Sequence, residues 1–146
     1  SAESYIDAEK IVCYCHATRK HYNDLMLEHL GHESIYEIGC RVMVTNNNLL
    51  DEYGICNRME FEIIKLYAND AGHLDLDKNI TVKNVQTNRV YKVLARDFTK
   101  GGIEPAYAIN VHQLQGSTIS SYYWASCDNM FLTARAAYVI ISRLKA

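Results

Sequence analysis

The spacing of hydrophobic positions changes along the chain, and each change predicts a different element. Residues 11–15 (Ile-Val-Cys-Tyr-Cys) form an apolar run without a charge, which is typical of a strand buried on both faces. A helical spacing then begins near Thr18 and ends at Gly31. The predicted apolar face of this helix comprises Tyr22, Leu25, Met26, His29 and Leu30. A strand followed directly by an amphipathic helix predicts the start of an α/β unit, and residues 39–45 predict a second strand.

The pattern shifts to alternation in the middle of the chain. Residues 59–63 alternate apolar with acidic side chains, as half-exposed strands do, and residues 80–83 alternate as well. A polar turn then leads into a further predicted strand at residues 89–96. The segment 46–103 is therefore predicted to be a small antiparallel β unit.

The α/β pattern returns after this segment. Residues 106–111 and 119–124 are strand-like and are separated by a polar break. Residues 131–144 predict a helix, although three consecutive β-branched residues within it oppose that prediction. The sequence thus predicts an α/β layer that is interrupted by a β insertion and then resumed.

Charge and composition limit the function classes. The chain has 146 residues, 15 Lys and Arg against 17 Asp and Glu, and a net charge of -2. Because a domain that holds nucleic acid by charge alone is normally basic, any such binding is expected to be local or shared. Basic residues do concentrate in 83–100 and acidic ones in 51–77. No apolar run approaches the roughly 18 residues of a membrane-spanning helix, so no membrane partner is expected.

The ends of the chain and its cysteines carry further expectations. The first residues resemble neither a signal peptide nor a natural start, so we expect a piece of a longer protein. The five cysteines are an odd number, which favours a reducing intracellular compartment over a disulfide framework.

Metal binding and thiol chemistry are two alternative functions for the cysteines and histidines. A cluster of thiols and imidazoles lies near the N-terminus: Cys13, Cys15, His16, His21, His29 and His32. It lacks the second spaced pair of ligands that structural zinc sites show, so no metal is predicted. A Cys-dependent hydrolase stays open as a further class, because Cys127 precedes Asp128 and Cys15 precedes His16.

Two C-terminal segments have a specific pattern. Residues 105–118 read Pro-Ala-Tyr-Ala-Ile-Asn-Val-His-Gln-Leu-Gln-Gly-Ser-Thr, and residues 138–143 read Tyr-Val-Ile-Ile-Ser-Arg. In this order and at this separation they resemble motifs V and VI of superfamily 1B helicases, the RecD/Pif-like branch that includes viral helicase-primase motors. Residues 11–23 resemble motif IV of the same family, and residues 39–57 resemble its entry into domain 2B.

The resemblance implies a fold and its boundaries. The implied fold is α/β: a RecA-like parallel-sheet domain (2A) interrupted by a small SH3-like antiparallel β-barrel (2B). Domain 2A would span residues 1–45 and 104–146, and domain 2B would span residues 46–103. This organisation agrees with the interrupted α/β pattern predicted from hydrophobic spacing.

The resemblance also implies one half of an ATP site. In such motors ATP and Mg²⁺ bind mainly to a first RecA-like domain through a Gly-x-x-x-x-Gly-Lys-Ser/Thr loop, which this sequence lacks. Arg143 matches the arginine finger that completes the site, and Arg19 is a second candidate catalytic cation. Gln115, Gly116 and Ser142 match nucleotide-facing positions. The chain alone is therefore expected to have no ATPase activity.

The remaining implied contacts are to single-stranded DNA. The matching positions are His112, Gln113, Thr118, Thr45, Asn47 and His16. Several positions depart from the family pattern: Gln113 replaces Lys, Leu114 replaces Ser, Asn110 replaces Thr and Arg58 replaces Gly. These departures indicate a divergent, viral branch.

The expected activity is that of an ATP-dependent DNA helicase with 5′ to 3′ translocation in DNA replication. The expected partners are single-stranded DNA, the N-terminal RecA-like domain of the same protein, and primase or other replication proteins, in the host nucleus or cytoplasm. The alternative is a non-catalytic nucleic-acid- or protein-binding module on a degenerate helicase scaffold.

Overall fold

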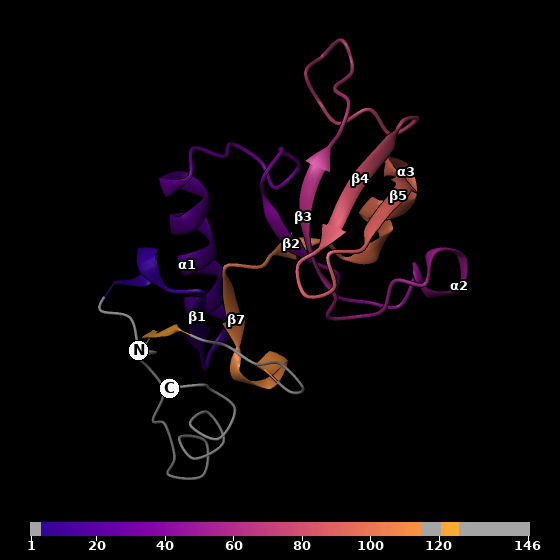
Figure 1. Cartoon of the computed structure of the whole chain (residues 1–146). Coiled ribbons are helices and arrows are strands. Elements are labelled where there is room, and N and C mark those ends of the chain that lie inside the picture. The colour runs from indigo at the N-terminus through magenta and orange to yellow at the C-terminus, as the bar shows by residue number, and fades with distance from the viewer. Residues whose placement is uncertain (1–3, 115–120, 126–146) are drawn as a thin grey trace. The chain divides into compact units, whose positions relative to one another are not determined.

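The computed structural model describes residues 4–114 and 121–125. The chain divides into two compact units (Figure 1). Unit 1 combines Ser1–Leu30 with Tyr107–Ala146, and unit 2 is Gly31–Ala106. The first unit therefore consists of two segments that are far apart in the sequence, with the second unit inserted between them.

Unit 1 is built on a parallel sheet with the strand order β7-β1-β8. The strands are β1 (Lys10–Cys13), β7 (Ala108–Asn110) and β8 (Tyr122–Ala125). Val12 of the central strand lies opposite Ile109 on one side and Trp124 on the other. All four residues of β1 are buried, which confirms the prediction of a strand covered on both faces.

Helix α1 (His16–His29) follows β1 directly, as predicted, although it begins two residues before Thr18. Its predicted apolar face is only partly right, because His29 and Leu30 are exposed. The fully buried positions of α1 are Arg19, Asn23 and Met26. Polar Asn23 occupies a core-facing position because its side chain bonds the backbone of β7, a contact that helical periodicity cannot predict.

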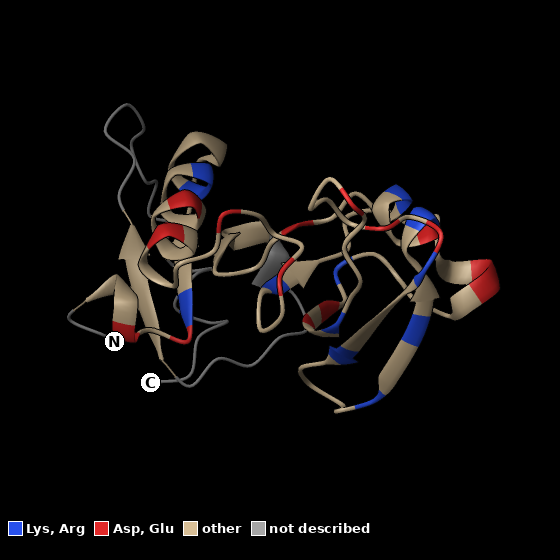
Figure 2. Cartoon of the chain, turned by 90° about the horizontal axis from the view of Figure 1, so that it is seen from above, with Lys and Arg blue, Asp and Glu red and all other residues tan. Residues whose placement is uncertain are grey.

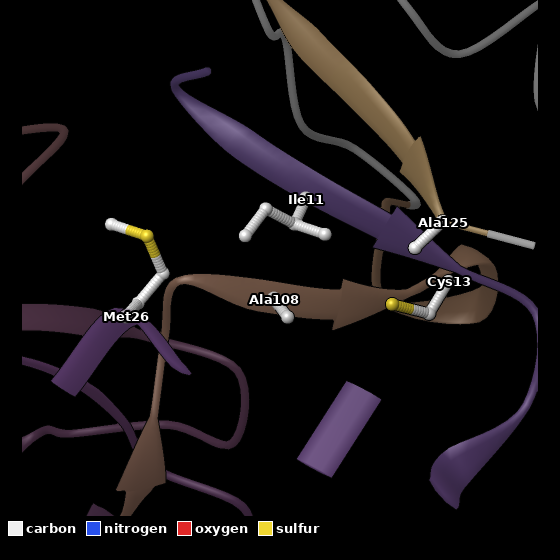
Figure 3. Close-up of a cluster of buried hydrophobic side chains, with 5 residues drawn as sticks. All are labelled: Ile11, Cys13, Met26, Ala108 and Ala125. Atoms are coloured by element: carbon white, nitrogen blue, oxygen red, sulfur yellow. The ribbon is translucent and has the colours of Figure 1, made fainter. Parts of the chain in front are cut away.

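The core of unit 1 lies around β1. It consists of Ile11, Cys13, Met26, Ala108 and Ala125, which come from the sheet and α1 (Figure 3). The tyrosines packed against it are Tyr5, Tyr22, Tyr107 and Tyr123. Tyr5 lies in the short helix η1 (Tyr5–Asp7), and a second short helix, η3 (Val111–Leu114), follows β7.

Unit 2 is an antiparallel sheet with the order β5-β4-β3-β2-β6. Its strands are β2 (Arg41–Met43), β3 (Glu60–Lys65), β4 (Asn79–Asn84), β5 (Val90–Leu94) and β6 (Glu104–Pro105). The short helices are α2 (Leu50–Tyr53), α3 (Ala95–Phe98) and η2 (Thr99–Gly101). Phe61, Phe98 and Tyr91 form edge-to-face ring contacts in the core. The predicted β3, β4 and β5 are confirmed.

The five-stranded sheet stays open. Within residues 31–106 no pairing joins the edge strands β5 and β6, so a closed SH3-like barrel is not seen in this part of the chain. The physical reason lies in β6, which has two residues and ends in Pro105, a residue without an N–H to donate to a ladder.

The boundaries of the units differ from those expected for an insertion at 46–103. The strand predicted at residues 39–45 exists, but it pairs antiparallel with β3 and β6 inside unit 2. Residues 31–45 and 104–106 thus belong to the antiparallel unit. An apolar strand does not carry in its own sequence the identity of the sheet that it joins. The helix predicted at 131–144 lies outside the described residues.

Candidate functional site

The candidate residues of unit 1 follow the carboxyl ends of neighbouring parallel strands. His16 and Arg19 come after β1, and His112 comes after β7. The carboxyl ends of parallel strands meet at one edge of a sheet, which is where α/β proteins bind their ligands. The parallel pairing of β1 with β7 therefore brings the motif IV and motif V segments to a common edge.

Asn110 links the loops at this edge. Its Nδ2 donates to the backbone oxygen of Tyr14 at 3.1 Å, and its Oδ1 accepts from the N–H of His112 at 3.1 Å. The side chain that replaces the family's Thr thus ties the end of β7 to the segment after β1. Sequence reasoning registered Asn110 only as a departure from the motif, whereas the structure gives it a positioning role.

Asn23 performs a similar task from the helix. Its Oδ1 accepts from the N–H groups of Ala108 at 2.7 Å and Tyr107 at 3.1 Å, and its Nδ2 donates to the oxygen of Ala108 at 3.2 Å. The amide is buried, so these bonds replace the water contacts that folding removes. Asn23 therefore holds α1 against β7.

His16 and Arg19 lie together at the first turn of α1. An Nη of Arg19 lies 3.2 Å from Nδ1 of His16, and Arg19 is only 7% exposed while His16 is exposed. The first turn contains no acidic residue, although acidic side chains are favoured at a helix N-terminus. Burial raises the pKa of the nearby Cys13 thiol to about 12, and the charge of Arg19 opposes that rise. The positive end of α1 thus carries additional basic groups.

Thr45 and Asn47 lie in unit 2, in the segment after β2. Thr45 Oγ1 donates to the backbone oxygen of Gly102 at 2.6 Å, and its N–H donates to that of Gly101 at 2.9 Å. Asn47 is exposed, and its Oδ1 accepts from the N–H of Asn57 at 2.8 Å. Both predicted DNA contacts therefore have bonds that hold neighbouring loops.

Most of the other predicted site residues are in parts of the chain that the structure does not describe. Arg143, Ser142, Gln115, Gly116 and Thr118 lie outside the described residues. His112 lies in η3 and is exposed. Gln113 lies in the same short helix, and only its backbone is described. Across residues 4–114 and 121–125, no group of three metal-ligating side chains is placed to hold an ion. No helix in the same part of the chain is both long and apolar enough to cross a membrane.

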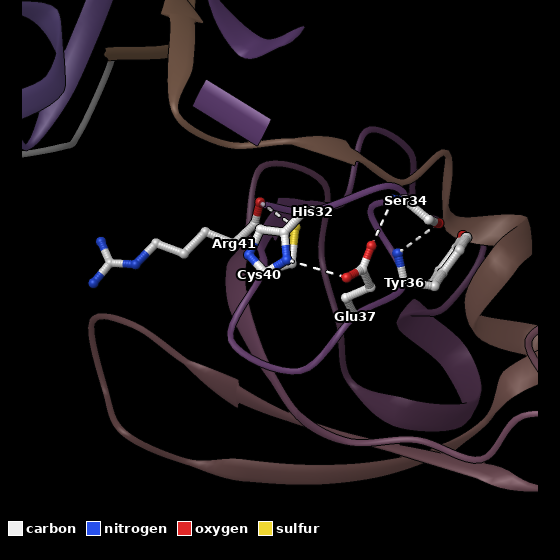
Figure 4. A network of polar contacts seen from close by, with 6 residues as sticks. All are labelled: His32, Ser34, Tyr36, Glu37, Cys40 and Arg41. Atoms are coloured by element: carbon white, nitrogen blue, oxygen red, sulfur yellow. Dashed lines mark hydrogen bonds and ion pairs between the residues drawn. The ribbon is translucent and has the colours of Figure 1, made fainter. Parts of the chain in front are cut away.

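The segment before β2 contains a polar network that sequence reasoning did not identify (Figure 4). Glu37 accepts from the N–H of Ser34 at 2.6 Å, and its other carboxylate oxygen lies 3.5 Å from Nδ1 of His32. Ser34 Oγ in turn accepts from the N–H of Tyr36 at 3.1 Å. His32, considered above as a zinc ligand, is thus half-buried beside a carboxylate.

A parallel sheet with its helix, interrupted by an antiparallel unit, makes this a mixed α/β fold consistent with a RecA-like helicase domain. Solved Pif1 helicase structures are similar to this chain in fold. The chain matches a Pif1 helicase from a study of DNA unwinding at forked DNA by two coordinating Pif1 helicases, with a TM-score of 0.62 and 20% identity, over 94% of this chain and 37% of that chain.

Two further matches are to Pif1 helicases of named organisms. The Bacteroides helicase in complex with ADP-AlF3 and ssDNA gives a TM-score of 0.57 at 19% identity, over 100% of this chain and 40% of that chain. The Candida albicans helicase gives a TM-score of 0.54 at 12% identity, over 99% of this chain and 44% of that chain. This chain thus spans less than half the length of each of these structures.

The sequence by itself matches no family model and no curated protein. At identities of 20% or less, the similarity is one of fold. It supports the helicase fold that the motifs imply. The viral origin and the helicase-primase assignment stay predictions.

Proposed function

We propose that this chain is the second RecA-like motor domain, with an inserted antiparallel unit, of an ATP-dependent superfamily 1B DNA helicase. The observation that carries the proposal is the similarity of fold to Pif1 helicases over 94% or more of the chain. The motif residues support it independently, because they were identified from sequence alone. The chain covers only part of those helicases, so the complete motor needs a further RecA-like domain that holds the phosphate loop and Mg²⁺.

The first turn of α1 supports a role in phosphate binding. Free N–H groups and the helix dipole favour an anion at such a position, and Arg19 and His16 add basic groups there. Phosphoryl transfer requires charge on the γ-phosphate to be matched by planar, permanently charged donors. In the proposed motor Arg143 is the arginine finger and Arg19 the second cation. Gln115, Gly116 and Ser142 position the nucleotide.

The nucleic-acid part of the proposal involves both units. His112, Gln113, Thr118 and His16 form the contacts from unit 1, and Thr45 and Asn47 form those from unit 2. The Bacteroides Pif1 helicase was solved with ssDNA, which makes single-stranded DNA the proposed ligand here. Closure of two RecA-like domains on ATP, followed by reopening after hydrolysis, would move the strand 5′ to 3′. Primase or other replication proteins are the proposed partners.

The experiment distinguishes a catalytic role of Arg143 from a nonspecific effect of substituting an arginine. Arg143→Ala is placed in a protein that joins this chain to the phosphate-loop domain, and DNA-stimulated ATP hydrolysis is measured beside nucleotide binding. Loss of a finger arginine costs roughly 10³-fold or more in turnover while nucleotide binding persists. Arg96→Ala is the matched control, because Arg96 is an exposed arginine paired with Asp77. Wild-type turnover by Arg143→Ala, or robust ATPase activity of residues 1–146 alone, would overturn the proposal.

A further inference from the structure

One face of the antiparallel sheet in unit 2 carries a row of basic side chains. The strand register places Lys65 of β3 opposite Thr81 of β4, and Thr81 opposite Lys92 of β5. Residues adjacent in sequence to Thr81 and Lys92 are buried in the core: Ile80, Val82, Tyr91 and Val93. Because side chains alternate between the faces of a strand, Thr81 and Lys92 point away from the core. A register shift between Ile63 and Lys65 interrupts the alternation in β3, and Lys65, which lies opposite Thr81, is exposed in the same row.

An exposed aromatic ring lies at one end of this row. Nζ of Lys65 lies 5.2 Å from the ring centre of Tyr67, and Tyr67 is 44% exposed. The hydrogen bond and charge of Lys65 lower the pKa of the Tyr67 phenol, and the charges of Lys78 and Lys92 lower it further. The Lys65 ammonium thus lies against the Tyr67 ring, and the charges of Lys78 and Lys92 act on the same phenol.

The carboxylates near the row only partly offset these charges. In the adjacent cross-strand row, Glu62 lies between Arg41 and Lys83. The Glu62 carboxylate therefore faces the two basic residues of its own row. Asp77 forms an ion pair with Arg96 at 2.7 Å. The backbone N–H of Asp75 donates to the backbone oxygen of Tyr67, and the Asp75 carboxylate accepts from the N–H of Asp77. The row of Lys65, Thr81 and Lys92 thus contains two lysines and no carboxylate, and Figure 2 shows basic segments on strands of this unit.

We propose that Lys65, Tyr67, Lys78, Thr81 and Lys92 form a contact surface for the phosphate backbone of single-stranded nucleic acid. This surface acts in addition to the motif residues, and it depends on the proposed function only in that the chain binds a nucleic-acid strand. Phosphates are bound by ammonium, hydroxyl and phenol groups without regard to base sequence. The overall charge of -2 does not oppose such binding, because the basic groups are concentrated locally.

The chemistry of the surface favours a nucleic acid over an acidic protein segment. Protein partners are anchored by apolar or aromatic side chains that fill pockets, whereas this row consists of ammonium and hydroxyl groups. One face of the Tyr67 ring is covered by the Lys65 ammonium. Adjacent strands lie ~4.8 Å apart, so Lys65 and Lys92 are about 10 Å apart across the sheet, within reach of successive phosphates of one strand.

The test measures binding of fluorescein-labelled oligothymidylate of about 15 nucleotides to the full 146-residue chain by fluorescence anisotropy at several salt concentrations. Lys65→Gln/Lys92→Gln should weaken binding about fivefold at low salt. It should also reduce the slope of log Kd against log salt by about 1.4, since each single-strand phosphate contact contributes roughly 0.7. Lys83→Gln/Arg96→Gln removes two charges from the same unit, but from groups that face carboxylates, and should change both quantities much less.

Three outcomes would overturn the proposal. The first is a Lys65→Gln/Lys92→Gln variant with the affinity and salt slope of the wild-type chain. The second is a wild-type chain without measurable oligothymidylate binding at low salt. The third is a Lys65→Gln/Lys92→Gln variant that loses the binding of a polyglutamate peptide but keeps its binding of oligothymidylate. The last outcome would assign the surface to an acidic protein. A parallel His112→Ala variant separates the two proposals: if it loses affinity while the lysine variant does not, the proposed function stands and this surface does not.

Discussion

Asn23 of α1 and Ala108 of β7 are joined by two hydrogen bonds, one in each direction, although 85 residues separate them in the sequence. Oδ1 accepts from the Ala108 N–H at 2.7 Å and Nδ2 donates to the Ala108 oxygen at 3.2 Å. One side chain thus takes the place of a neighbouring strand for this residue. Because β7 leads into η3 with the candidate residue His112, Asn23 helps to position this residue relative to α1.

We expect Asn23→Ala to destabilise unit 1 by roughly 2–3 kcal/mol, because it leaves buried backbone groups without partners. Urea denaturation followed by the fluorescence of Trp124, the single tryptophan, reports on this unit, since Trp124 lies in β8 opposite Val12. Asp24→Ala, at the next and exposed position of the helix, should stay within about 0.5 kcal/mol of wild type. Equal unfolding free energies for the two variants would show that the Asn23 bonds contribute nothing.

Gly102 is expected to tolerate no side chain. It has a φ of +64°, and a Cβ there would collide with Oγ1 of Thr45, which bonds the Gly102 oxygen. Gly102→Ala should therefore destabilise unit 2 by roughly 2–4 kcal/mol, the sum of left-handed backbone strain and the collision. Gly72→Ala is the control, because Gly72 has a φ of +81° but open space around it, so only the strain of about 1–2 kcal/mol applies. Chemical denaturation followed by circular dichroism compares the variants, and similar losses would contradict the collision.

The cysteines of the described residues should differ strongly in reactivity. Burial raises the pKa of Cys13 to about 12, so that only about one thiol in ten thousand is ionised at pH 8, whereas Cys56 is exposed. Iodoacetamide at pH 8, followed by peptide mass mapping, should label Cys56 quickly and Cys13 hardly at all until urea is added. Labelling of both residues at one rate in the folded protein would contradict the burial of Cys13.

The Glu37 network predicts a pH dependence of stability. The hydrogen bond from the Ser34 N–H lowers the pKa of Glu37, and His32 lowers it further. A lowered folded-state pKa means that the stabilisation is present above the ordinary value of 4.5 and is lost as the pH falls through the lower folded value. Glu37→Gln should therefore reduce the free energy of unfolding at pH 7, by less than ~1 kcal/mol because the group is partly exposed to solvent. The reduction should be smaller at about pH 3, where Glu37 is largely protonated.

Urea denaturation at the two pH values measures this difference. Glu33→Gln removes a charge from an exposed neighbour and should show a smaller change between the two pH values. A Glu37→Gln effect of the same size at pH 7 and pH 3 would exclude ionised Glu37 as its source.

Local patterns predicted the elements that carry their own periodicity. Three residues of the uncharged run 11–15 form β1 together with Lys10, and the helical spacing of α1 and the alternation of β3 and β4 appear in the structure as expected. The four-residue helices α2 and α3 were not predicted, because one turn of helix is too short to show a 3.6-residue period. Element type thus followed from sequence wherever an element was long enough to repeat its pattern.

Some features of the candidate site were likewise predicted from the sequence, and others were not. The motif segments were recognisable from residue identity and order, and the parallel pairing of β1 with β7 agrees with their expected proximity. The structural roles of Asn23 and Asn110 were not predicted, because each depends on a backbone group more than 80 residues away. Thr45 was predicted as a DNA contact, and the structure adds a bond to Gly102 that no local pattern indicates.

By itself, the sequence determined the kinds of elements, the interrupted α/β order and the helicase-like motifs, since these depend on residues close together in the chain. Only the tertiary structure decided that β2 joins the antiparallel sheet, that this sheet stays open, and that Lys65, Thr81 and Lys92 form one row. Strand partners and register depend on backbone hydrogen bonds, and every residue except proline offers the same groups for them. The choice among partners is therefore made by packing of the whole unit.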